Sequence, residues 1–125
     1  MRLAPFTILF VALWIGPAER AIAQSGDTES GRRLAREHCA RCHVVGDFNP
    51  YGGVGSTPSF QLLAKRDDWR ERFETFYARR PHPVFVRVPE VDRWTDLPSP
   101  MAEFRVTQEN LRNIMAFVRT LRPGN

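Results

Sequence analysis

Several residue types are scarce in this sequence, and each scarcity excludes a class of protein. The chain has only two cysteines and three histidines, and both cysteines and one histidine lie within five residues of one another. If these three form one site, only two residues remain, too few to complete the four ligands of a separate structural zinc site. Lys65 is the single lysine, and with 18 basic residues against 14 acidic ones the formal net charge is only +4, so no nucleic-acid surface is expected. No apolar run reaches the roughly 20 residues that cross a bilayer as a helix. Internal repeats and low-complexity segments are absent from the sequence as well.

The first residues have the pattern of a secretory signal peptide. Arg2 precedes an apolar stretch at residues 3–16, and Ala21-Ile22-Ala23 follows as a cleavage site of small residues. The stretch is too short for an uncleaved membrane anchor, and no cysteine follows the cleavage site to carry a lipid. Residues 1–23 are therefore predicted to be a cleaved signal peptide. Residues 24–125 are predicted to form one exported domain without a membrane span.

Both cysteines fall in one segment, Cys39-Ala40-Arg41-Cys42-His43. A C-x-x-C-H sequence is typical of covalent haem c attachment, in which two thiols form thioethers with the haem vinyl groups and the histidine binds the iron. Cysteines at this spacing on one helical turn share a face, so both reach the edge of one flat ring. A thioredoxin-type pair would need a βαβ context, and a disulfide would leave the histidine unexplained. Cys39 and Cys42 are therefore predicted attachment sites, and His43 the proximal ligand.

The spacing of apolar residues predicts four helices, so we expect an all-α fold. Apolar positions recur at steps of three and four through residues 31–42, which indicates a first helix with both cysteines on or near its inner face. A short second helix is expected within residues 57–65. A third helix should begin at Asp68 and a last one at Thr107, ending before a Pro-Gly pair.

The third and last helices carry most of the expected core. Asp68 and Glu71 have the spacing of a capping box at the start of the third helix. Its aromatic stripe should form core and wall the cofactor: Trp69, Phe73, Phe76 and Tyr77. Val106 and Leu111 stand where a hydrophobic staple would place them before and within the last helix. Met115 lies amid the apolar face of that helix, so we expect it in the core.

Two further stretches are predicted to be irregular. Prolines exclude helix through most of residues 81–100, and residues 84–88 lack an evident partner strand, so we expect an extended loop. Arg79-Arg80 is expected to be the solvated end of the third helix. The glycines at residues 52–55 match no nucleotide-binding pattern, and we expect them to have a steric role beside the haem.

A six-coordinate haem iron would need a second axial ligand from elsewhere in the chain. Met101 ends the rigid segment Pro98-Ser99-Pro100-Met101, where a thioether can be held against iron, and a Met/His pair is an established haem ligation. His82, which lies between two prolines, is the alternative distal ligand. His38 lies too near the attachment point to reach the opposite haem face. Met101 is therefore predicted as the distal ligand, with His82 next.

The chain resembles the small class I c-type cytochromes over most of residues 24–125. The residues that carry the resemblance are Gly31-Arg32-Arg33-Leu34, Cys39-x-x-Cys42-His43, Thr57-Pro58-Ser59-Phe60, Pro100-Met101, Val106-Thr107 and Asn113-Ile114-Met115-Ala116-Phe117-Val118. The resemblance implies a small helical domain wrapped around one covalently bound haem c. It also implies that the Pro58 carbonyl accepts the Nδ1 proton of His43, and that Met101 is the distal ligand.

Two further implications concern packing and the haem propionates. Gly31 would lie where the first and last helices cross, against Phe117 or Ala116. Residues 81–99 form a longer stretch than the smallest family members have, which leaves the propionate environment open. Candidates for contacts with the propionates are Trp94, Arg87, Arg93 and Tyr51, without an order among them.

These features predict a periplasmic electron carrier and not an enzyme, since no paired acid and base residues accompany the single haem motif. Its partners would be redox proteins: a donor dehydrogenase and an acceptor oxidase or reductase. One alternative is a haem c subunit of a periplasmic dehydrogenase, which an apolar patch over residues 81–99 would favour. Another is a gas or redox sensor with a labile distal ligand.

Overall fold

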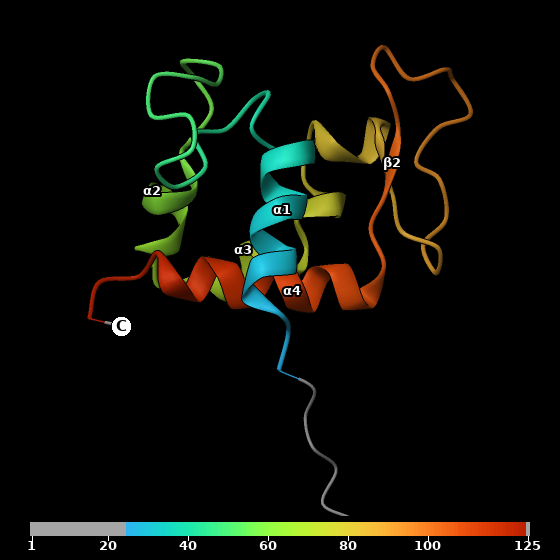
Figure 1. The fold of residues 1–125 in the computed structure, drawn as a ribbon. Coiled ribbons are helices and arrows are strands. Elements are labelled where there is room, and N and C mark those ends of the chain that lie inside the picture. The colour runs from blue at the N-terminus through green and yellow to red at the C-terminus, as the bar shows by residue number, and fades with distance from the viewer. Residues whose placement is uncertain (1–24, 125) are drawn as a thin grey trace, which may run out of the picture.

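The computed structural model describes residues 25–124, so the predicted signal peptide lies outside the described residues. The elements in chain order are α1 (Thr28–His38), α2 (Phe60–Ala64), α3 (Trp69–Glu74), η1 (Phe76–Ala78), η2 (His82–Val84), β1 (Val86–Arg87), β2 (Phe104–Arg105) and α4 (Gln108–Thr120). Figure 1 shows α1 standing across α4, with α2 and β2 on opposite sides of α1. The predicted all-α class is confirmed, because the strands within residues 25–124 form only one two-residue pair.

Helices α1 and α4 cross with their backbones in contact. A Cβ atom on Gly31 would overlap the carbonyl group of Asn113 in α4, so only glycine permits this approach. The buried Asn113 side chain reinforces the crossing, because its Oδ1 accepts the backbone N–H of Asp27 at 2.7 Å. The predicted crossing at Gly31 is confirmed. Its partner is the backbone at Asn113, however, about one turn before the expected Phe117 or Ala116.

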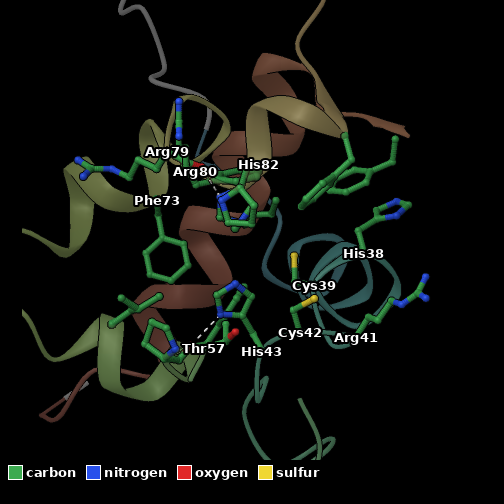
Figure 2. Close-up of a pocket in the computed structure, with 18 of the residues that line it drawn as sticks. His38, Cys39, Arg41, Cys42, His43, Thr57, Phe73, Arg79, Arg80 and His82 are labelled. Atoms are coloured by element: carbon green, nitrogen blue, oxygen red, sulfur yellow. Dashed lines mark hydrogen bonds between the residues drawn. The ribbon is translucent and has the colours of Figure 1, made fainter. Parts of the chain in front are cut away.

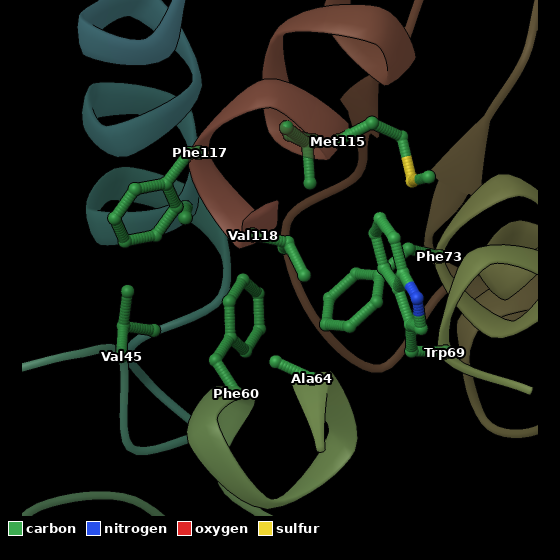
Figure 3. Close-up of a cluster of buried hydrophobic side chains, with 10 residues drawn as sticks. Val45, Phe60, Ala64, Trp69, Phe73, Met115, Phe117 and Val118 are labelled. Carbon is green, nitrogen blue, oxygen red and sulfur yellow. The ribbon is translucent and has the colours of Figure 1, made fainter. Parts of the chain in front are cut away.

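The main hydrophobic core lies where α2 and α3 pack on α4 (Figure 3). Its largest fully buried side chains are Phe117, Val45 and Val118. The rings of Phe60 in α2 and Phe73 in α3 meet edge to face, with 5.0 Å between their centroids. Met115 is 5% exposed and belongs to this core, as predicted. The core therefore holds in place two aromatic rings that also face the cavity described below.

Helix α3 begins without the predicted capping box. The Asp68 carboxylate makes no hydrogen bond to the helix backbone, and instead accepts one from Nε of Arg66 and one from Nε of Arg72, each at 2.8 Å. These hydrogen bonds hold the pKa of Asp68 well below its usual range. Charge-assisted hydrogen bonds to two guanidinium groups compete with the backbone cap for the Asp68 carboxylate. The spacing of Asp68 and Glu71 therefore predicted a capping box that does not form.

The segment predicted to be an extended loop contains a strand, and this corrects the sequence-based expectation. Strand β1 pairs in parallel with β2, with Val86 opposite Phe104 and Arg87 opposite Arg105. The Arg87 guanidinium strengthens the pair, because its Nε donates to Glu103 Oε2 at 3.1 Å. The partner strand lies beyond a proline-rich loop, so no local alternation of residues could reveal the pairing.

Helix α4 begins where the sequence predicts. Thr107 is its N-cap and forms a capping box with Asn110. Val106 and Leu111 are both buried in a second small hydrophobic cluster that also contains Val86, which agrees with the expected staple. Within residues 25–124 no helix has the length and apolar character needed to cross a membrane.

Candidate haem site

A cavity of about 570 Å³ opens between the end of α1, the segment before α2 and the η1–β2 region. Its larger apolar lining residues include Phe60, Leu63, Phe73, Phe76, Phe85, Met101, Phe104 and Ile114. Figure 2 shows Cys39 and Cys42 together on one side of this space, and the rings of His43 and His82 facing one another. We name Cys39, Cys42, His43 and Pro58 the proximal wall. The distal wall is His82, Phe85, Met101 and Phe104.

Both thiols reach the cavity from the turn that ends α1. The helix stops at His38, so the predicted first helix is too long, and Cys42 lies in the turn that follows. The turn is closed by hydrogen bonds from the backbone N–H groups of Cys42 and His43 to the Cys39 carbonyl, at 3.1 and 2.9 Å. Both thiols are free, and burial raises the pKa of Cys39 to about 12. The Cys39 thiol is therefore protonated at neutral pH.

Asn49 holds this turn in shape and was missed by the sequence analysis. Its Nδ2 donates to the carbonyls of Ala40 and His43, each at 2.9 Å, and its Oδ1 accepts the backbone N–H of Val45 at 2.7 Å. One side chain thus satisfies three backbone groups around the cysteine segment. The only signal in the sequence was the Asn49-Pro50 pair, which indicates a turn but not what the side chain binds.

The His43 ring is oriented for metal binding. Its Nδ1 lies 2.7 Å from the carbonyl oxygen of Pro58, as the resemblance implied. Burial lowers the pKa of His43, so the neutral ring donates its Nδ1 proton to Pro58 and keeps the Nε2 lone pair free. The edge of Phe60 supports the ring at a centroid distance of 5.5 Å.

His82 is oriented in the same manner on the distal wall. Its Nδ1 lies 2.9 Å from the carbonyl oxygen of Arg79. Its ring is nearly parallel to that of His43, with 6° between the planes and 6.1 Å between the centroids. Burial lowers the pKa of His82, so this ring is neutral as well.

The other candidate ligands occupy different positions. Met101 lines the cavity and is partly buried, and its backbone N–H donates to Ser99 Oγ at 3.3 Å. His38 stacks on Phe104 with 4.5 Å between centroids, so it packs against the distal wall from the end of α1. The structure therefore brings His43, His82 and Met101 to one cavity and places Met115 in the core behind it.

The arginines around the cavity differ from those expected. The basic residues that line it are Arg41, Arg72, Arg79 and Arg80. The expected propionate contacts lie elsewhere: Arg87, Arg93 and Trp94 surround a small separate pocket, and Tyr51 is fully exposed. Arg79 is bonded to Glu71 at 2.8 Å, whereas the Arg80 guanidinium lies over the Trp94 ring at 5.7 Å. Arg79-Arg80 is therefore part of the cavity wall and not merely a solvated helix end.

The residues present fit a haem. The cavity volume lies within the ~300–1,000 Å³ typical of cofactor sites, and its lining is largely aromatic and aliphatic. Two thiols lie on one side, and a neutral imidazole points its free nitrogen into the space. Such a site defines a protein that carries a covalently attached haem.

Comparison with known proteins agrees with this class. A family model described as cytochrome c matches residues 28–122. Cytochrome c-552 of Bradyrhizobium diazoefficiens is 28% identical over 101 residues, which cover 81% of each chain. A 55-residue segment is 40% identical to alanine–tRNA ligase of Pyrobaculum calidifontis, but this is 6% of that protein's length. No solved structure matches.

The chain belongs to the cytochrome c family. Its cofactor is a covalently bound haem c, for which two cysteines are present, and its activity is electron transfer with redox partners. The short match to alanine–tRNA ligases covers so little of those proteins that it carries no argument about function.

Proposed function

We propose that this protein is an exported electron carrier whose haem is attached through Cys39 and Cys42 and ligated on one face by His43. The observation that carries the proposal is the His43 ring. Its Nδ1 is bonded to the Pro58 carbonyl at 2.7 Å, and its other nitrogen is directed into an apolar cavity beside both thiols. Such a bond orients the ring and raises its basicity toward iron.

The chain's own residues account for the rest of the role. A bound haem supplies iron that alternates between Fe(II) and Fe(III). Phe60 and Phe73, held in the core, exclude water from the haem faces and lower the local dielectric constant. The turn clamped by Asn49 keeps the thiols and His43 in one arrangement, so electron transfer requires little movement of the protein. No acid–base step is needed, and the protein acts as a carrier and not as an enzyme.

The propionate side of the haem is proposed to face Arg80. The vinyl and propionate groups lie on opposite edges of the macrocycle, and Arg79 and Arg80 lie across the cavity from Cys39 and Cys42 (Figure 2). Arg79 is already bonded to Glu71. Arg80 contacts an aromatic ring instead, so its guanidinium is available to a carboxylate.

Export follows from the first 23 residues, which have the pattern of a signal peptide. The predicted compartment is the bacterial periplasm, and cleavage after Ala23 would leave a chain that begins at Gln24. Thiols in that compartment are exposed to oxidation, so haem attachment has to compete with a Cys39–Cys42 disulfide.

Expression with cytochrome c maturation proteins tests this function. Intact-mass measurement should give the chain from Gln24 plus one haem, with a reversible change between oxidised and reduced spectra. The double variant Cys39→Ala/Cys42→Ala should release all haem under denaturing extraction, while each single variant keeps at most one thioether. Covalent haem in the double variant would refute the assignment of the attachment sites. The full-length mass would refute export.

A second function is favoured by one observation. Three apolar residues of the 81–99 stretch are exposed: Val91, Trp94 and Leu97. Exposed apolar side chains in this stretch suit a permanently bound partner subunit, as in a haem c subunit of a dehydrogenase. The native mass of the haem protein isolated from its own cells separates the two functions. A stoichiometric complex supports the subunit, and a monomer supports the free carrier.

A further inference from the structure

We propose that His82, and not Met101, is the second axial ligand of the haem iron, so that this cytochrome c has bis-histidine ligation. The proposal rests on the proposed haem site and specifies its sixth coordination position. Its foundation is the geometry of two side chains from opposite walls of the cavity, His43 and His82.

The separation of the two rings suits one iron between them. A His–metal bond is about 2.0 Å and the ring centroid lies a further ~1.1 Å from the bonding nitrogen, so an axial histidine pair has centroids about 6.2 Å apart. The observed centroid distance between His43 and His82 is 6.1 Å. Offset aromatic pairs have centroid distances in the same range, so the choice between a stack and a shared atom depends on the hydrogen bonds of the two rings.

Hydrogen bonding leaves the same nitrogen free on both rings. Nδ1 of His43 is bonded to the Pro58 carbonyl at 2.7 Å, and Nδ1 of His82 to the Arg79 carbonyl at 2.9 Å. A carbonyl can only accept, so each Nδ1 carries the proton and each Nε2 has its lone pair. Figure 2 shows the two rings facing one another across the cavity.

The surrounding aromatic rings hold His82 in this position. Phe76 meets the His82 ring edge to face at 5.2 Å, and Phe85 does so at 5.8 Å. Met101 lines the same cavity, but the place opposite His43 is occupied by His82. For Met101 to bind the iron on that axis, the His82 ring would have to leave its contacts with both phenylalanines and with Arg79.

The test compares the haem-loaded wild type with His82→Ala, His82→Met and Met101→Leu. The wild type should be low-spin in both oxidation states, should not bind carbon monoxide when reduced, and should lack a sulfur-to-iron charge-transfer band. His82→Ala should bind carbon monoxide, and added imidazole should restore the low-spin spectrum. His82→Met should gain the charge-transfer band and a higher reduction potential. Met101→Leu, which removes the competing sulfur, should leave the iron low-spin and closed to carbon monoxide.

Electron paramagnetic resonance of the ferric wild type supplies a test that does not depend on any variant. Two parallel imidazole planes raise the energy of the same iron d orbital, so the small angle of 6° predicts a rhombic low-spin signal with three resolved g values. A charge-transfer band in the wild type that Met101→Leu abolishes would overturn the proposal, and so would carbon monoxide binding by the wild type. Absence of covalent haem would instead contradict the proposed function itself.

Discussion

The two walls of the haem cavity differ in how the chain builds them. The proximal wall takes both cysteines and its histidine from residues 39–43, a single turn that Asn49 clamps. The distal wall gathers residues from 82 to 104 through a strand pair and a series of ring contacts. Nearby residues in sequence lose little chain entropy when they meet, whereas distant ones need tertiary contacts to hold them. This difference explains why the proximal ligand can be identified from a motif and the distal one cannot.

The α1–α4 crossing supports both walls, so damage there should have the largest effect. Gly31→Ala places a methyl group against the Asn113 carbonyl, and the helices must separate. We expect the free energy of unfolding of the haem-loaded protein to fall by about 3 kcal/mol, near the upper end of overpacking effects. Denaturant titration measures this loss. Gly55→Ala is the matched control, because nothing lies within 4 Å of the added atom. Equal stability of the two variants would contradict the close crossing.

Removing the Asn49 side chain should damage the proximal wall alone. Asn49→Ala leaves the Val45 N–H and two carbonyls without this partner, and we expect a loss of about 2 kcal/mol. The yield of covalent haem should fall as well, because the turn no longer presents both thiols together. Asn49→Asp keeps an acceptor for the Val45 N–H but sets a carboxylate oxygen against the Ala40 and His43 carbonyls, so its loss of stability should be at least as large. Full haem yield and unchanged stability in Asn49→Ala would show that the clamp is unimportant.

Removing Phe104 should damage the distal wall alone. Its ring stacks on His38 at 4.5 Å and contacts Phe85 at 6.2 Å. Because Phe104 is only partly buried, we expect Phe104→Ala to cost about 1.5 kcal/mol, less than a core phenylalanine would. Haem attachment should stay complete, while carbon monoxide should gain partial access to the reduced iron. Spectra under carbon monoxide and haem-stained gels measure the two properties separately. Reduced attachment would mean that the walls are not independent.

The smallest effect should come from the ion pair beside the strands, and it should depend on pH. Hydrogen bonding to Arg87 and charge from Arg93 lower the pKa of Glu103 below its usual 4.5. A lowered pKa in the folded protein means that the contribution to stability is present above pH 4.5 and is lost as pH falls through the folded value. Glu103→Gln should therefore be less stable than the wild type at pH 6 to 7, and the difference should shrink in acid. A difference in stability that grows in acid would contradict a stabilising ion pair of Glu103 with a lowered pKa.

Local patterns predicted much of the fold correctly. The start of α4 at its Thr107 cap, the burial of Met115 and the short α2 all follow from residues close together in sequence. Two local predictions were wrong because a distant or competing partner intervened. Asp68 binds two arginines in place of the helix backbone, and β1 pairs with a strand beyond a proline-rich loop.

The sequence by itself determined the chemistry of the proximal side. Cys39, Cys42 and His43 lie within five residues, so one turn of chain brings them together. Only the tertiary structure could place His82 opposite His43, because the two residues are far apart in sequence and meet only when the segment around His82 folds across the cavity from the turn after α1. A proline-flanked methionine and a proline-flanked histidine look alike as candidates in the sequence. The folded chain favours the one whose ring faces His43 at the spacing of a shared iron.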